Sequence, residues 1–153
     1  MNVPNILVLS GPNLNLLGTR EPQIYGSATL DQIHERLQRE AELLGCTVLC
    51  FQSNHEGALI DFLQEHRGSA AGALLNPGGL THDSVSLHDA IKAMPFPVVE
   101  VHLSNIQARE EWRRHSVTAA AAFGQVTGLG WISYVTALWG LLAYLRNEQP
   151  TSL

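Results

Sequence analysis

Apolar and polar residues follow one another along the chain in a pattern that predicts strands and helices in strict alternation. Segments with apolar residues three or four positions apart indicate helices, and short runs of apolar residues indicate buried strands. We expect strands over Asn5–Ser10, Thr47–Gln52, 73–76, 98–103 and Gly124–Thr127. The expected helices cover 29–44, 56–66, 84–94, 106–115 and 131–146.

The order of these elements predicts the fold class. The first helix has clear limits, since Thr29 and Gln32 match a capping box and Gly45 is typical of a helix end. Short buried strands that alternate with helices pair in parallel, and right-handed crossovers place the helices on both faces. We therefore predict an α/β fold: a flavodoxin-like, doubly wound, five-stranded parallel sheet with helices on both faces, forming one domain over 1–153.

One segment interrupts the alternation. Residues 11–28, GPNLNLLGTREPQIYGSA, follow the first strand and carry enough glycine and proline to stop a helix or a strand. Irregular segments this long are uncommon in compact domains unless they act as lids or binding loops. The leucines and isoleucine of the segment make it too apolar for a disordered linker. We interpret it as an active-site lid that carries Asn13, Arg20 and Tyr25.

Polar residues gather where the predicted strands end. Ligands of parallel α/β sheets bind beyond the carboxyl ends of the strands. The segments that follow the first, third and fourth strands are 13–25, 76–82 and 100–105, and all three contain proton-active or amide side chains. The topology therefore predicts one site on this rim.

Composition and charge limit the classes of partner. The 153 residues are 45% hydrophobic and 15% charged, with a formal net charge of −5. The negative charge argues against nucleic acid or an anionic membrane as a partner, although a local arginine can still bind a small anion. The low share of charged residues also suggests surface buried between subunits.

The same sequence indicates a reduced, cytoplasmic protein. It shows no signal-peptide pattern at its start, and its longest apolar run is too short to cross a bilayer. Cys46 and Cys50 are too few and too closely spaced for a disulfide framework, so we expect buried thiols.

Several kinds of chemistry lack their usual motifs. The chain has no GxGxxG or GxxxxGK[ST] pattern for a dinucleotide or a nucleotide, and no GxSxG elbow. The histidines lack metal-ligand spacing, so we expect no metal and no cofactor. Proton transfer remains. A tyrosine ordinarily ionises near pH 10, so Tyr25 needs a cation such as Arg20 to act as a base. With His102 as the acid and Asn13 as an oxyanion donor, the set suits elimination of water next to a carbonyl.

Five segments together carry a resemblance to a known family. They read GPNLNLLGTREP with IYG, QSN with EG, NPG with TH and SV, EVHLSN, and REEWR with HS. In this order, from about residue 5 to 146, they resemble the type II 3-dehydroquinate dehydratases. The resemblance implies a cofactor-free anti elimination of water that converts 3-dehydroquinate into 3-dehydroshikimate. That step serves shikimate synthesis and quinate breakdown alike, and both roles stay open.

The resemblance also implies catalytic roles, taken residue by residue. Tyr25 would remove the C2 proton, and Arg20 would activate it from the lid. Asn13 would hold the enolate oxygen through a water molecule. His102 would protonate the departing C1 hydroxyl, and Glu100 would orient that histidine.

The remaining implied roles concern the substrate. Asn76 and the amides around Leu103 and Ser104 would bind its carboxylate. His82 and Arg113 would bind its ring hydroxyls.

Two more positions complete the implied site. Arg109 would line it, and Asp89, on a helix, would reach into the site of a neighbouring subunit. The family typically forms a dodecamer of four trimers, so the resemblance implies a homo-oligomer of that kind.

The chain departs from the family pattern at a few positions. Trp112 stands where phenylalanine is more usual, and Ile132 and Ser133 stand where glycine is common. We expect both departures to affect packing away from the rim. Asp83 follows His82 where a neutral residue is more usual, and we expect it to change the local charge.

Three other functions compete with this interpretation. The first is a lyase that forms a lysine imine, for which Lys92 is the only candidate. The second is a flavin- or phosphate-binding module on the same fold. The third is a non-catalytic assembly protein.

Overall fold

The central sheet is five-stranded and entirely parallel. In the computed structural model, which describes residues 2–146, its strands are β1 (Asn5–Ser10), β2 (Thr47–Gln52), β3 (Gly72–Asn76), β4 (Val98–His102) and β5 (Gly124–Thr127). The strand order is β2-β1-β3-β4-β5. This is the order of the flavodoxin-like doubly wound sheets, so the predicted fold is confirmed.

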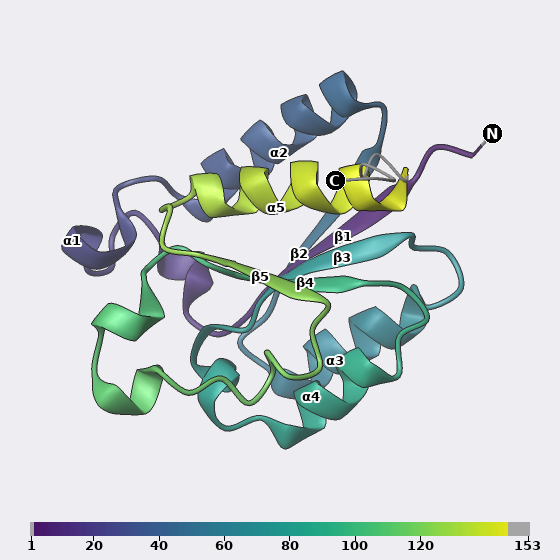
Figure 1. The fold of residues 1–153 in the computed structure, drawn as a ribbon. Helices are drawn as coiled ribbons and strands as arrows, with labels where there is room; N and C mark the ends of the chain where they lie inside the picture. The colour runs from purple at the N-terminus through teal and green to yellow at the C-terminus, as the bar shows by residue number, and fades with distance from the viewer. Residues whose placement is uncertain (1, 147–153) are drawn as a thin grey trace, which may run out of the picture.

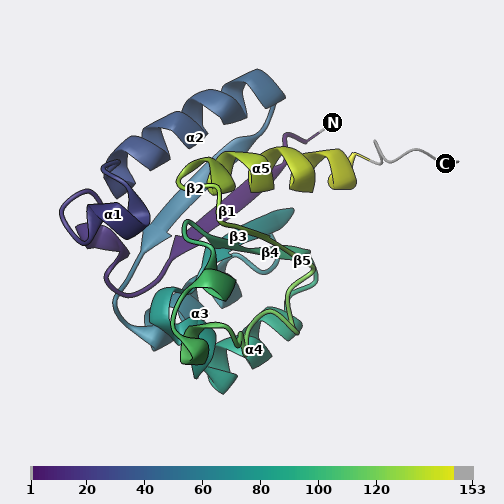
Figure 2. The same ribbon diagram turned by 60° about the vertical axis from the view of Figure 1, so that its left-hand side comes forward.

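Helices cover both faces of the sheet. The elements are α1 (Pro22–Tyr25), α2 (Leu30–Leu44), α3 (Glu56–Glu65), α4 (Val85–Lys92) and α5 (Ile132–Leu145). Figure 1 shows α2 and α5 on one face and α3 and α4 on the other. Figure 2 shows the same layers after rotation, with the short α1 standing away from the sheet.

The two faces bury separate cores. Successive strand side chains point to opposite faces, so Ile6 and Val8 of β1 pack with α2 and α5, whereas Leu7 and Leu9 pack with α3 and α4. All four are fully buried. The interior strand β1 is therefore fixed from both sides, which fixes where its carboxyl end lies.

The predicted limits of the first long helix are confirmed. The Thr29 hydroxyl accepts the Gln32 amide at 3.2 Å, and the Gln32 side chain accepts the Thr29 amide at 3.0 Å. Gly45 ends α2 in the left-handed region, with φ 70°. Among residues 2–146, no helix is both long enough and apolar enough to cross a membrane.

Two segments differ from the prediction. The lid at 11–28 is not wholly irregular, since it contains a 3-10 turn, η1 (Leu14–Leu16), and the single turn of α1. The helix predicted over 106–115 is wrong: the segment forms two 3-10 turns, η3 (Ile106–Ala108) and η4 (Glu111–Arg113). Only one side chain of these turns is buried, so a longer helix would have no apolar stripe to pack.

Candidate active site

A cavity of about 120 Å³ lies beyond the carboxyl ends of β1, β3 and β4. This is where the strand order reverses and where ligands of such sheets bind. The lining residues are Pro12, Asn13, Leu14, Arg20, Tyr25, Asn76, Gly78, Gly79, His82, His102, Leu103, Ser104, Ile106, Arg109 and Arg113. Every residue predicted for the site is in this set except Glu100 and Asp89.

Two glycines let the loops after β1 and β3 meet backbone to backbone. The Gly11 amide donates to the Asn76 carbonyl at 2.8 Å, and a Cβ atom on Gly11 would lie 2.4 Å from the Pro77 carbonyl oxygen. Gly78 has φ +59°, and a Cβ atom there would lie 2.9 Å from the Pro12 carbonyl oxygen. A larger side chain at either position would push the two loops, and their site residues, apart.

Asn13 starts the lid in an unusual conformation. Its φ is 69°, in the left-handed region that asparagine tolerates better than most residues. Its amide donates to the Asn54 side chain at 2.9 Å, and Gln52 donates to the same oxygen at 3.1 Å. Sequence reasoning gave Asn54 no role, although the Gln52–Asn54 segment stood out as a motif. The end of β2 thus anchors the lid.

Tyr25 contacts two arginines. The Arg109 guanidinium donates to the Tyr25 hydroxyl at 2.9 Å, and its Cζ lies 5.2 Å from the ring centroid. The Arg20 Cζ also lies over the ring, 5.1 Å from the centroid. Arg20, predicted to activate Tyr25, is therefore a ring contact, and the hydroxyl is held by Arg109, to which the prediction gave only a lining role.

Arg109 and Arg113 both reach the cavity, although no helix carries them. Their Nε atoms lie 3.7 Å and 3.0 Å from the same Glu110 carboxylate oxygen. They do not share a helix face, as the predicted helix over 106–115 would have given them, because Arg109 has extended backbone between the two 3-10 turns. The shared carboxylate brings the two side chains together instead.

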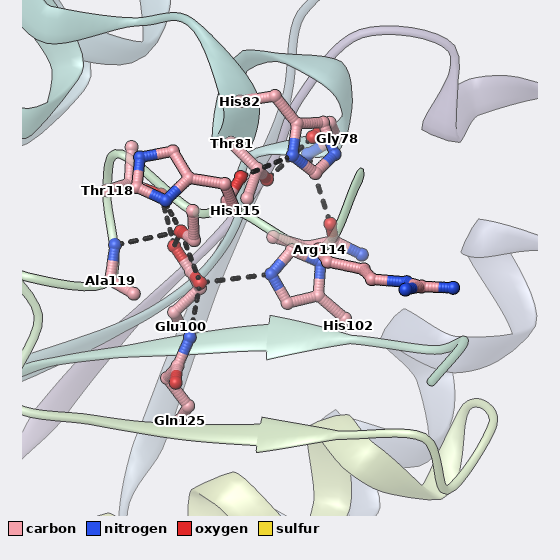
Figure 3. A network of polar contacts seen from close by, with 12 residues as sticks. Gly78, Thr81, His82, Glu100, His102, Arg114, His115, Thr118, Ala119 and Gln125 are labelled. Atoms are coloured by element: carbon pink, nitrogen blue, oxygen red, sulfur yellow. Dashed lines mark hydrogen bonds and ion pairs between the residues drawn. The ribbon is translucent and has the colours of Figure 1, made fainter. Parts of the chain in front are cut away.

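His102 and Glu100 form a buried pair at the end of β4. The Nε2 atom of His102 lies 3.1 Å from a carboxylate oxygen of Glu100, and the two residues are 6% and 1% exposed. Figure 3 shows Glu100 turned toward the imidazole. Since an ionised carboxylate only accepts hydrogen bonds, Nε2 carries a proton and Nδ1 is the nitrogen left for other partners. Glu100 therefore contacts the histidine from below the cavity and does not line the cavity itself.

Three further side chains hold Glu100, and sequence reasoning missed all of them. Ser116, Thr118 and Gln125 each hydrogen-bond to its carboxylate. Burial acts to raise the pKa of Glu100, but the hydrogen bonds from His102, Thr118 and Gln125 outweigh it, so the pKa is lowered. Only the Ser116 position lay in a quoted motif, and no local signal marked Thr118 or Gln125.

His82 is held by the backbone and by an aromatic neighbour. Its Nδ1 lies 2.8 Å from the His115 carbonyl oxygen, and its ring meets Trp112 edge-on with centroids 5.8 Å apart. The guanidinium carbon of Arg113, Cζ, lies 4.1 Å from the centroid of the same Trp112 ring. The expectation that Trp112 lies away from the rim is therefore wrong. It packs against two residues that line the cavity.

The floor of the cavity is formed by strand ends. Asn76 is buried, and its side-chain oxygen accepts the Gly78 amide at 3.1 Å. Leu103 and Ser104 follow β4 directly and line the same space. Behind them, Tyr134 is fully buried with its hydroxyl 2.9 Å from that of Ser10, and burial raises the pKa of Tyr134 to about 12. Tyr134 is thus a packed side chain, while Tyr25 is the tyrosine of the site.

Comparisons with known proteins show which family the chain belongs to. The sequence matches the family model described as "Dehydroquinase class II" over residues 4–142. It is 54% identical to a 3-dehydroquinate dehydratase of Roseiflexus castenholzii over 145 residues, which are 95% of this chain and 92% of the relative. The chain belongs to the class II dehydroquinase family.

Solved structures of the same family share the fold. A type II dehydroquinase from Butyrivibrio crossotus aligns with TM-score 0.89 and 40% identity, covering 91% of this chain and 97% of that one. A second, from Propionibacterium acnes, aligns with TM-score 0.89 and 38% identity, covering 93% and 99%. Membership in this family supports a dehydratase rather than the flavin- or phosphate-binding module that the fold alone also suggested.

Two residues singled out in the sequence lie away from the cavity of this class II dehydroquinase. Asp89 is exposed on α4, and Lys92 is exposed in the last turn of the same helix. Neither lines the site, so Lys92 is badly placed to form an imine there. Among the residues that the structure describes, no three histidine, cysteine or acidic side chains form a group that could hold a metal. The two cysteines are free thiols.

Replacing Glu100 by glutamine should destabilise the protein most at neutral pH. A carboxylate whose pKa is lowered by folding stabilises the fold above its ordinary pKa, here 4.5, and this contribution is lost as the pH falls through the lowered value. Glutamine does not ionise, and its amide would face donors rather than acceptors. We expect the free energy of unfolding to fall by about 2–3 kcal/mol at neutral pH.

Urea unfolding at two pH values, at one protein concentration, measures this difference. The difference in the free energy of unfolding between the native protein and the glutamine variant should become smaller below pH 4.5. A gap of equal size at neutral and acid pH would show that Glu100 is not ionised in the fold.

Proposed function

We propose that the protein catalyses the elimination of water from 3-dehydroquinate to give 3-dehydroshikimate, with Tyr25 as the base and His102 as the acid. One observation carries the proposal. A tyrosine hydroxyl held by an arginine and a histidine held by a buried carboxylate line the same cavity of a class II dehydroquinase.

The base step uses the arginines around Tyr25. A phenolate in contact with the guanidinium groups of Arg109 and Arg20 keeps its negative charge close to two cations. It removes a proton from C2, next to the substrate carbonyl, and leaves an enolate. The side-chain amide of Asn13, at the start of the lid, stabilises the enolate oxygen through a bridging water.

The acid step uses the His102–Glu100 pair. With Nε2 donating to Glu100, the Nδ1–H of the imidazolium is the proton that His102 delivers. The C1–O bond breaks, the hydroxyl takes this proton and leaves as water, and the electrons of the enolate form the new double bond. Since one proton leaves C2 and one reaches the hydroxyl, the reaction balances without a redox cofactor.

Substrate binding relies on local positive charge. Arg20, Arg109 and Arg113 all line the cavity, although the whole chain has a net charge of −5. They attract an anionic substrate. Asn76 and the amides at Leu103 and Ser104 hold its carboxylate at the strand ends.

The remaining contacts concern the ring of the substrate. His82 and Arg113 hold its hydroxyls, and Asp83, exposed beside His82, adds a negative charge to this part of the rim. Residues 1–153 form one dehydroquinase domain in this proposal.

We also propose that the subunits assemble as a dodecamer of four trimers in the cytoplasm. Only 15% of the residues are charged, and large apolar side chains such as Trp139 and Phe123 are about half exposed in the single chain, at 50% and 55%. Such side chains are suited to contacts between copies. The two free thiols fit a reducing compartment.

Replacing Asp89 by alanine should weaken substrate binding and leave the fold intact. Its carboxylate is exposed on α4 and cannot line the site of its own chain. In the proposed assembly this carboxylate enters a neighbouring site, so its loss should raise KM several-fold. That change corresponds to about 1 kcal/mol of substrate-binding free energy. Asp61→Ala, an exposed carboxylate on α3, is the matched control and should leave KM unchanged.

Mixed oligomers test whether Asp89 acts between chains. When Asp89→Ala and the inactive Tyr25→Phe are co-assembled, some intact Tyr25 sites receive an intact Asp89 from the neighbour. Their KM should return to the native value. A KM that stays at the Asp89→Ala value in the mixture would show that Asp89 does not act in a neighbouring chain's site.

Turnover of 3-dehydroquinate tests the function itself. The conjugated enone product is followed by its ultraviolet absorbance, with a chelator present, for the native protein and for Tyr25→Phe. Metal-independent turnover that is lost in the variant supports both the reaction and the base. An inactive native protein would overturn the proposed function.

A further inference from the structure

The carboxylate of Glu100 is held by more donors than its pairing with His102 needs. Ser116 lies 3.0 Å from the oxygen that contacts His102, and the Gln125 amide lies 2.8 Å from the same oxygen. Thr118 hydrogen-bonds to the other oxygen. Figure 3 shows His102 of β4, Gln125 of β5 and Thr118 of the loop that precedes β5 around the Glu100 carboxylate. Both oxygens are therefore fixed, and so is the plane of the carboxylate.

The loop that carries Ser116 and Thr118 is itself held by hydrogen bonds to two neighbouring segments. The Val117 amide donates to the Thr81 carbonyl at 2.7 Å, and the Val117 carbonyl lies 2.8 Å from Nδ1 of His88 on α4. The His115 carbonyl holds His82 at 2.8 Å. Residues 115–118, which we call the strap, thus contact the substrate-facing His82 and the buried Glu100 at once.

We propose that Ser116, Thr118 and Gln125 are positioning residues for the acid step, which hold the Glu100 carboxylate ionised and aimed at Nε2 of His102 so that Nδ1 faces the cavity. This inference rests on the proposed function. None of the three side chains lines the cavity, so they act on the substrate only through the pair.

Other ionisable groups near His102 do not share this support. The ones that line the cavity with it are Arg20, Tyr25, His82, Arg109 and Arg113. None of them hydrogen-bonds to Glu100 in the described structure. Loss of a Glu100 donor therefore changes the acid step and leaves the base and the substrate contacts in place, so kcat should fall while KM stays near its native value.

Thr118 allows a matched pair of variants. Thr118→Val keeps the buried shape but removes the hydroxyl, and Thr118→Ser keeps the hydroxyl but removes a methyl group. We expect Thr118→Val to lower kcat about tenfold, equivalent to about 1.4 kcal/mol, with KM within about twofold. Thr118→Ser should recover most of the loss. Thr47→Val, which removes a hydroxyl bonded to Asn5 far from the site, should behave as the native protein.

Gln125→Leu provides an independent test, because this side chain is exposed on the edge strand β5 and its loss should leave the fold intact. The proposal requires the same pattern, a lower kcat with little change in KM. A native kcat in both Thr118→Val and Gln125→Leu overturns the proposal. So does a change in KM with kcat unaltered, or a Thr118→Ser variant with a kcat as low as that of Thr118→Val. An inactive native protein would instead overturn the proposed function, so the two failures are distinct.

Discussion

Replacing Tyr25 by phenylalanine should lower kcat by about two orders of magnitude or more while the fold stays intact. The change removes only the hydroxyl that Arg109 contacts at 2.9 Å and leaves the ring beside both arginines. No other tyrosine can take over. Tyr134 is buried, which raises its pKa to about 12, and Tyr144 of α5 packs against Phe123 outside the cavity.

Steady-state turnover of 3-dehydroquinate measures the effect, and Tyr144→Phe is the matched control. The control loses an equivalent hydroxyl at a position outside the lining, so its kcat should be native. A Tyr25→Phe variant that keeps more than about a tenth of the native kcat would mean that another group removes the proton. The proposed mechanism would then be wrong even if the reaction were right.

Loss of either arginine beside Tyr25 should have an effect of similar size. We expect Arg109→Ala and Arg20→Ala each to lower kcat by about two orders of magnitude or more, because in the proposed mechanism both cations stabilise the phenolate form of the base. Arg109 does so through a hydrogen bond to the hydroxyl, and Arg20 through its position over the ring. A hundredfold loss corresponds to about 2.7 kcal/mol of transition-state stabilisation.

Lysine at the same two positions separates the two contributions. Lysine keeps the charge but cannot reproduce the planar guanidinium, which both stacks and donates in fixed directions. Arg109→Lys should recover part of the activity through a single donor, whereas Arg20→Lys should recover less. Arg39→Ala, an exposed cation on α2, is the control. Near-native kcat in Arg109→Ala would contradict the hydrogen bond as the source of activation.

The sequence was sufficient to predict the sheet because its signals are local. Four apolar runs, a capping box at Thr29 and a stop at Gly45 each depend on a few neighbouring residues, and the parallel order follows from the alternation of strands with helices. The fifth strand, with the sequence GQVT, is the weakest of these signals. The segment 106–115 failed because its signal is also local. Its local pattern resembled a helix, but only Ile106 of the two short turns is buried, so a helix there would have no apolar stripe to pack.

The positions of the site residues were predictable, whereas their partners were not. Strand ends place Asn76, His82 and His102 on one rim in any sheet of this topology. The arginine that holds Tyr25 lies 84 positions away along the chain, and the donors to Glu100 lie 16 to 25 positions away. Such contacts depend on how a loop folds back across the rim, which no spacing rule describes. The contact of Trp112 with His82 is of the same kind.

The all-parallel sheet has a consequence for how the protein becomes active during synthesis. No two neighbouring strands are joined by a hairpin, so every pairing must wait for a crossover to be made. Non-local pairings of this kind form slowly. The support of Glu100 is completed by Gln125 on β5, the last strand to leave the ribosome. A nascent chain that stops short of β5 would thus contain Tyr25, His82 and His102 and still lack one donor to Glu100, so we expect full activity only after β5 has been made.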